Sequence, residues 1–241
     1  MPIELPVMLT EQSESWKAIF EVYEALPHGW ILVGGQAVYL HAIERNAPAP
    51  RATKDADFAL DIRAYPQHLN AFTGTLKDLG FESAGESLQG HQHRWLRGEA
   101  VVDVLIPRFM GEVSEKRTGV TGGTTLAAPG TQAALDRAET VEVVAGEFAG
   151  KVNRSTLLGS MIGKAAALKI MDDPGRMRHV TDFLTLASVI QLKDLRGAEY
   201  EPSARSHLAN MLGSLVVHPE WMATVPEAAD GVERLRMSLQ G

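Results

Sequence analysis

Two aspartates that lie two positions apart, Asp55 and Asp57, form the pair whose spacing points most directly to chemistry in this 241-residue sequence. They open a stretch that ends at Ile62, in which apolar and polar residues alternate as in a β-strand. Residues i and i+2 of a strand point the same way, so two negative charges would lie close together, which is costly unless a cation neutralises them. Mg²⁺ prefers such oxygen ligands and keeps room for substrate phosphates. The alternative is an edge strand whose acidic side chains face solvent.

A third carboxylate, Asp103, lies within the apolar run of residues 101–106. A charge in so apolar a strand needs a partner or an ion. With Asp55 and Asp57 it would complete a site for two Mg²⁺ ions, with Mn²⁺ as a substitute. One ion would bind a triphosphate and the other would lower the pKa of an attacking hydroxyl. The alternative for Asp103 is an ion pair with a neighbouring arginine or lysine.

A glycine pair, Gly34-Gly35, follows the short apolar run Trp30–Val33 and precedes a helical pattern at Gln36–Ile43. Glycines allow a sharp turn between a strand and a helix, and they let a phosphate approach the amides at the start of the helix. By itself, a Gly-Gly pair before a helix is usually only a turn.

The elements that would position these residues predict an α/β (α+β) fold, with a mixed sheet and helices in the first half and a helical C-terminal half. Accordingly, we expect two domains, residues 1–153 and 154–241. Helical patterns cover Ser13–Leu26, Gln36–Ile43, Tyr65–Leu79, Thr131–Ala138 and much of the chain after Asn153, and strand patterns cover Trp30–Val33, Asp55–Ile62, His93–Leu96, Ala100–Ile106, Val141–Ala145 and Phe148–Val152. Residues 111–130, rich in Gly and Thr, predict an irregular loop.

The composition excludes several kinds of site and disfavours some classes of partner. The absence of cysteine excludes disulfides, cysteine zinc sites and cysteine nucleophiles. No signal-peptide pattern and no apolar run of about 18 residues is present, so we expect a cytoplasmic protein that does not bind membranes. The net charge of −7 is not typical of a nucleic-acid binder. Residues 151–200, with 8 basic and 5 acidic side chains, are where a polyanion would bind, unless they form an ordinary solvated face.

The combination of Gly34-Gly35, Asp55-x-Asp57 and Asp103 resembles the polymerase β-type nucleotidyltransferase superfamily. Residues 51–57, Arg-Ala-Thr-Lys-Asp-Ala-Asp, are similar to the Arg-x-Thr-x-Asp-x-Asp form of the AbiEii/MenA-type toxins. Two downstream helix motifs of those toxins resemble residues 163–168, which contain Lys164, and residues 178–183, which contain Asp182. Three features depart from the pattern: the 19-residue spacer between Gly35 and Asp55, Gln36 in place of a small hydroxyl residue, and His179 in place of an aspartate.

This resemblance implies a polymerase β-like fold and roles for individual residues. Lys164 would bind the triphosphate, unless it extends to solvent, and Asp182 would orient Lys164 or contact the nucleotide, unless it only pairs with Arg178. The implied catalytic residues are Asp55, Asp57, Asp103, Lys164 and Asp182, the metal ligands are Asp55, Asp57 and Asp103, and the nucleotide-binding residues are Gly34, Gly35, Arg51, Thr53 and Lys164.

Three functions remain open at the level of the sequence. The resemblance implies a toxin that transfers a nucleotide from a nucleoside triphosphate to the 3′ end of tRNA, releases pyrophosphate and is paired with an antitoxin. A nucleotidyltransferase acting on a small molecule of the aminoglycoside type is the alternative, and the acidic net charge would attract such cationic acceptors. The third function is that of a non-catalytic nucleotide-binding protein.

Overall fold

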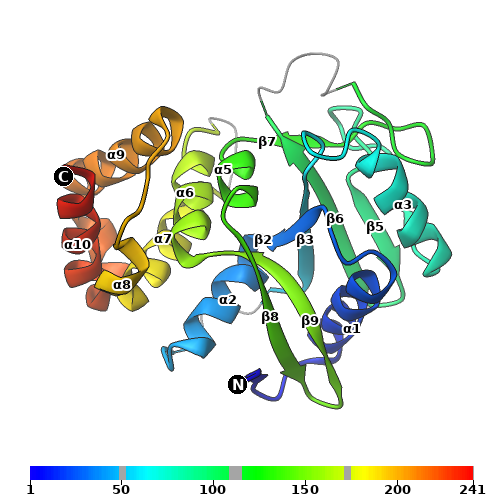
Figure 1. The fold of residues 1–241 in the computed structure, drawn as a ribbon, viewed down its shortest axis with the longest axis horizontal. Helices are drawn as coiled ribbons and strands as arrows, with labels where there is room; N and C mark the ends of the chain where they lie inside the picture. The colour runs from blue at the N-terminus through cyan, green and yellow to red at the C-terminus, as the bar shows by residue number, and fades with distance from the viewer. Residues whose placement is uncertain (49–52, 109–115, 171–174, 241) are drawn as a thin grey trace.

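The computed structural model describes residues 1–48, 53–108, 116–170 and 175–240. Its centre is a mixed sheet in the order β1-β8-β9-β2-β3-β6-β5-β4, with β7 paired to β6 (Figure 1). The predicted mixed α/β sheet followed by a helical C-terminal half is therefore confirmed. The strands are β1 (Ile3–Leu5), β2 (Trp30–Val33), β3 (Asp55–Leu60), β4 (Glu82–Ser83), β5 (Arg94–Arg97), β6 (Ala100–Pro107), β7 (Leu126–Ala128), β8 (Ala138–Ala145) and β9 (Phe148–Ser155).

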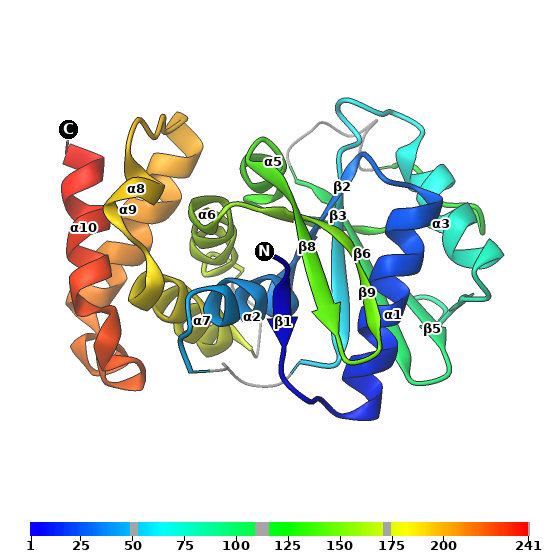
Figure 2. The same ribbon diagram turned by 60° about the horizontal axis from the view of Figure 1, so that its bottom comes forward.

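Helices surround this sheet. In Figure 2, α1 and α3 lie on one side of the sheet, while α2, α6 and α7 lie between the sheet and the last helices of the chain. The helices are α1 (Thr10–Ala25), α2 (Gly34–Glu44), α3 (His68–Asp78), α5 (Thr131–Leu135), α6 (Leu157–Ala167), α7 (Arg176–Val189), α8 (Leu192–Leu195), α9 (Pro202–Val217) and α10 (Ala229–Gln240), with 3₁₀ turns at Pro219–Thr224 and Pro226–Ala228. Among the described residues, no helix has the length and apolar character needed to cross a membrane.

The strand that carries the acidic pair, β3, lies in the interior of the sheet. It pairs antiparallel with β2 and parallel with β6, so the edge-strand alternative is wrong. Ala56, Phe58 and Leu60 are buried on one face, and Ala59 is buried on the other against Ala134 of α5. With both faces covered, the side chains at the start of β3 are held in a fixed direction.

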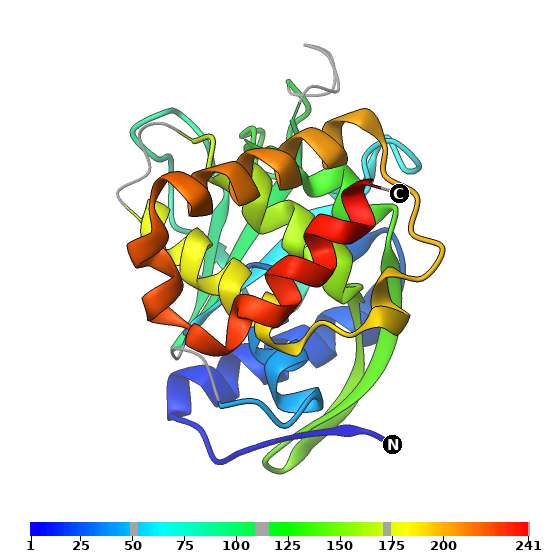
Figure 3. The ribbon, with the colours of Figure 1, turned by 90° about the vertical axis from the view of Figure 1, so that its left-hand side faces the viewer.

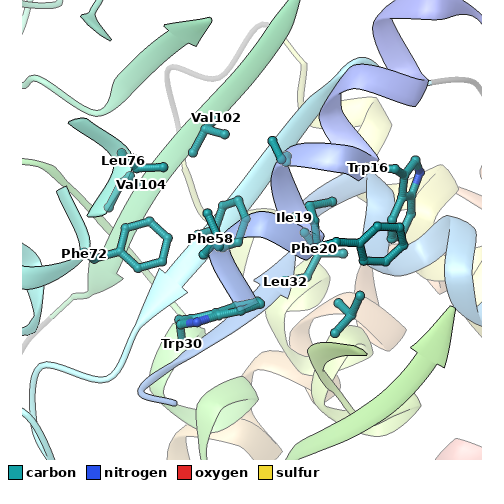
Figure 4. Close-up of a cluster of buried hydrophobic side chains, with 14 of the residues drawn as sticks. Trp16, Ile19, Phe20, Trp30, Leu32, Phe58, Phe72, Leu76, Val102 and Val104 are labelled. Carbon is teal, nitrogen blue, oxygen red and sulfur yellow. The ribbon is translucent and has the colours of Figure 1, made fainter. Parts of the chain in front are cut away.

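The main core fixes that direction. Figure 4 shows aromatic and aliphatic side chains from α1, α3 and the sheet packed around Phe58. The ring of Phe58 lies 5.0 Å from that of Trp30 and 5.1 Å from that of Phe72, centroid to centroid. Burying each such ring contributes about 1.5–3 kcal/mol. Because even-numbered residues of β3 face this core, Asp55 and Asp57 face the opposite side of the sheet, where α2 and α5 lie.

The C-terminal helices have a core of their own. Side chains from α6, α7, α9 and α10 pack together, with Val38 of α2 among them. In Figure 3, α9 and α10 face the viewer, in front of α6 and α7. The last strand, β9, ends at Ser155 and α6 begins at Leu157, capped by the Thr156 hydroxyl, which accepts a hydrogen bond from the Gly159 amide at 3.3 Å. The division into two domains at residue 153 stays a prediction.

Candidate active site

Four residues lie in register across the four neighbouring strands β2, β3, β6 and β5. Val33 of β2 is the pairing partner of Asp57, Asp57 is the partner of Asp103 of β6, and Asp103 is the partner of Arg94 of β5. Neighbouring strands lie about 4.8 Å apart. Asp55 lies two residues before Asp57 on the same face of β3. The three carboxylates expected to act together therefore meet on one face of the sheet, and Arg94 lies beside them.

The glycine pair lies directly against this acidic group. α2 begins at Gly34, whose φ of +67° is in the left-handed region that favours glycine. A Cβ atom added to Gly34 would lie 1.8 Å from Oδ2 of Asp57, and one added to Gly35 would lie 2.9 Å from Cγ2 of Thr53. The glycines are thus required for the close approach of α2 to β3, and they bring the N-terminus of a helix to the carboxylates.

Two residues position the start of β3. The Thr53 hydroxyl donates a hydrogen bond to Oδ1 of Asp55 at 2.7 Å. The buried side chain of Gln36 donates from Nε2 to the Thr53 carbonyl at 3.2 Å, which connects the first turn of α2 to the residues before β3. The sequence analysis gave Gln36 no place in the site. Its position one residue after the glycine pair, in a helix otherwise rich in apolar residues, is the signal that could have indicated it.

Asp57 is the carboxylate most affected by its surroundings. Loss of hydration and the neighbouring charges of Asp55 and Asp103 raise the pKa of Asp57 from its ordinary value of 3.8 to about 7, and Lys164 and Arg94 only partly offset this. Part of the Asp57 residue still reaches solvent. The group of three carboxylates therefore carries more negative charge than its two neighbouring cations neutralise, and a further cation would stabilise the ionised form of Asp57.

Arg94 is the charged residue of the site that the sequence analysis missed. Its Nε donates to Oδ1 of Asp103 at 2.8 Å and its Nη2 donates to Oδ2 at 2.6 Å, while Nη2 also lies 3.6 Å from Oδ2 of Asp55. The alternative expected for Asp103, an ion pair with a neighbouring arginine, is the arrangement that the structure has. Across the described parts of the chain, no group of three or more His, Cys, Asp or Glu side chains is arranged to hold a metal ion.

Lys164 of α6 and Asp182 of α7 form a buried ion pair. Nζ of Lys164 donates to Oδ2 of Asp182 at 2.7 Å, and the two side chains are 10% and 4% exposed. Lys164 therefore does not extend to solvent. It lies close enough to lower the pKa of Asp57, so the pair belongs to the electrostatic surroundings of the acidic group. Arg51, expected to contact the nucleotide, lies outside the described residues.

No protein-family model and no curated protein matches the sequence. Among solved structures, the chain is similar to the antibiotic-resistance factor ANT(2'')-Ia, with a TM-score of 0.43 and 15% sequence identity over 88% of this chain and 99% of the other.

Proposed function

We propose that this protein is a Mg²⁺-dependent nucleotidyltransferase, which transfers a nucleoside monophosphate from a nucleoside triphosphate to a hydroxyl acceptor and releases pyrophosphate. The observation that carries the proposal is the packing of Asp57, two residues after Asp55 on β3, against Gly34 at the N-terminus of α2. Carboxylates, a helix N-terminus and a nearby lysine together provide a place for a metal–triphosphate complex.

The residues at this place fit a divalent cation. Asp55 and Asp57 supply hard oxygen donors. Burial, followed by the charges of Asp55 and Asp103, raises the pKa of Asp57, and a bound cation would offset this cost. When bound, Mg²⁺ would neutralise the triphosphate and make the attacking hydroxyl more acidic. The first amides of α2 would donate to phosphate oxygens, because the first N–H groups of a helix have no partner within the helix. Lys164 would face the triphosphate, held in place by Asp182.

The transfer itself requires positioning more than covalent chemistry by the protein. The acceptor oxygen forms a bond to the α-phosphorus, and the bond between that phosphorus and the oxygen bridging to the β-phosphate breaks. Pyrophosphate leaves with the bonding electrons, and the proton of the acceptor hydroxyl passes to a carboxylate of the site. Gly34 and Gly35 allow this geometry, since a side chain on either would occupy the space at the carboxylate or at Thr53.

As the acceptor, we propose a small cationic molecule of the aminoglycoside type. The net charge of −7 would attract a cation and would repel a polyanion. Two of the basic residues in the segment of residues 151–200 are held in ion pairs, Arg154 with Glu44 and Glu139, and Lys164 with Asp182. This weakens the case for that segment as a surface for tRNA. A tRNA acceptor, with an antitoxin as partner, is the second outcome that the experiment must distinguish.

The experiment measures transfer of label. The protein is incubated with Mg²⁺ and each nucleoside triphosphate labelled on the α-phosphate, with either a panel of aminoglycosides or total tRNA. Label on a drug, with pyrophosphate released in equal amount, supports the proposal. Label on tRNA identifies the toxin function instead, and nucleotide binding without transfer to any acceptor identifies a non-catalytic protein. The Asp57→Asn variant is the control, because it keeps the shape of the side chain and removes the charge.

A further inference from the structure

The guanidinium of Arg94 lies among the carboxylates of the candidate site. It makes a two-pronged contact with Asp103, at 2.8 and 2.6 Å, and its Nη2 lies 3.6 Å from Asp55. The contact follows from the strand pairing, because Arg94 and Asp103 are direct partners in the antiparallel pair of β5 and β6. Arg94 thus lies between two of the three residues that a two-ion site would use.

The two partners of this contact differ strongly in solvent exposure. The side chain of Asp103 is 9% exposed, whereas that of Arg94 is 45% exposed. Both oxygens of the buried carboxylate already accept a hydrogen bond from a charged donor, which is among the strongest kinds of hydrogen bond in proteins. A divalent ion bound to Asp103 would have to displace this donor from the carboxylate.

We propose that Arg94 takes the place of the second metal ion. The inference rests on the proposed function. The chain then binds one divalent cation, at Asp55 and Asp57, and the guanidinium held by Asp103 supplies the second positive charge that the triphosphate meets. The hydrogen bonds to Asp103 come from Nε and Nη2, and the side chain of Arg94 is 45% exposed, so a ligand can reach it. A planar guanidinium with remaining donors is well suited to bind phosphate.

The test counts bound Mn²⁺ ions by electron paramagnetic resonance, with the metal alone as the probe. We expect one ion per chain in the unchanged protein and two in Arg94→Gln, because loss of the guanidinium frees Asp103. Arg94→Lys keeps one positive charge and should keep one ion. Arg63→Gln is the matched control: it removes the same charge from an exposed arginine beyond the far end of β3 and should bind one ion.

A second variant keeps the inference testable if Arg94→Gln does not fold. Asp103→Asn should still bind one Mn²⁺ ion, since Asp103 is not a ligand in this proposal, whereas a two-ion site would lose an ion. The affinity of a triphosphate, measured separately by calorimetry without metal, should fall by about tenfold in Arg94→Gln and remain unchanged in Arg63→Gln.

The outcomes separate this inference from the proposed function. Two ions in the unchanged protein, or one ion of the same affinity in Arg94→Gln, would overturn the role of Arg94 and leave nucleotidyl transfer in place. Loss of one ion in Asp103→Asn would do the same. If the unchanged protein binds no Mn²⁺, or if Asp57→Asn binds it as well as the unchanged protein does, the proposed metal site itself is wrong.

Discussion

The carboxylate of Asp57 lies so close to Gly34 that a Cβ atom on Gly34 would come within 1.8 Å of Oδ2. The start of α2 therefore packs directly on the middle of the acidic group, with no room between them for a side chain at position 34. This contact also distinguishes Gly34 from most of the other described glycines with a positive φ, at which an added Cβ atom would meet nothing within 4 Å.

Gly34→Ala should therefore prevent the site from forming. Gly146→Ala is the matched control, since Gly146 also has a positive φ (+63°) but meets nothing within 4 Å. The control should lose about 1–2 kcal/mol of unfolding free energy from backbone strain, whereas Gly34→Ala should lose more and should not bind nucleotide. Chemical denaturation and calorimetry would measure both. Equal losses in the two variants would mean that the contact with Asp57 can relax.

Asp57→Asn should abolish transfer and make the metal-free protein more stable. Its raised pKa, about 7, means that ionised Asp57 costs free energy in the fold, and asparagine removes this cost at neutral and alkaline pH. We expect a higher melting temperature above pH 7 and a fall in kcat of about a thousandfold or more. A variant that retains activity would show that the reaction takes place elsewhere.

The protein should be able to fold without the buried pair of Lys164 and Asp182 but should not catalyse transfer without it. Asp182→Asn leaves the Lys164 ammonium buried without its carboxylate, and such a loss costs about 3–5 kcal/mol. Replacing both residues, Lys164→Met with Asp182→Leu, should recover most of the stability but not the transfer activity, because no ammonium would face the triphosphate. Melting curves and the label assay measure the two effects. Normal activity in the double variant would reduce the pair to a structural role.

Protonation of the buried His41 should lower the free energy of unfolding in mild acid. It is buried in α2, and its Nε2 donates to the Ser155 carbonyl at 3.0 Å. Burial, followed by the nearby charge of Arg154, holds the pKa of His41 well below its ordinary 6.5, although Nδ1 lies 4.0 Å from a carboxylate oxygen of Glu44. A folded pKa below the unfolded one means that the stability present above pH 6.5 is lost as the pH falls toward the folded pKa.

This loss can be measured by denaturation between pH 7.5 and about pH 5. The unfolding free energy should fall by up to about 1.4 kcal/mol per pH unit from this group. His41→Gln should show a shallower slope, and the contributions of the other histidines, including His68 and His207, cancel in the comparison. Parallel slopes in the two proteins would mean that His41 is not the group responsible.

The elements around the acidic pair could be predicted closely from the sequence, for physical reasons that are local. Two glycines between an apolar strand and a helical pattern indicate β2 and α2, and alternation indicates β3. The strand β1 was not predicted, since Ile3–Leu5 is too short to show a period, and it forms only through its pairing with β8. The short strand β7, at Leu126–Ala128, was likewise missed inside the expected loop because it depends on β6.

The role of Arg94 was missed because two neighbouring strands were predicted without their register. β5 and β6 are joined by the two residues Gly98-Glu99, and a two-residue hairpin loop pairs the residues on either side of it. Counting outward from this turn places Arg94 opposite Asp103. That signal was present in the sequence. The pairing of Lys164 with Asp182 depends instead on how α6 packs against α7, and no local pattern contains that information.

The order of strands in the sheet has a consequence for how the protein forms during synthesis. β1 pairs with β8, and β2 pairs with β9. The pairing of Ile3 cannot form before Val143 has been synthesised, nor that of Leu32 before Arg154. Contacts between such distant positions slow folding, because a long loop must close before they form. A growing chain therefore exposes the open edge of β2 until about 150 residues have left the ribosome. During this time Asp55 and Asp57, on the neighbouring strand β3, belong to an incomplete sheet.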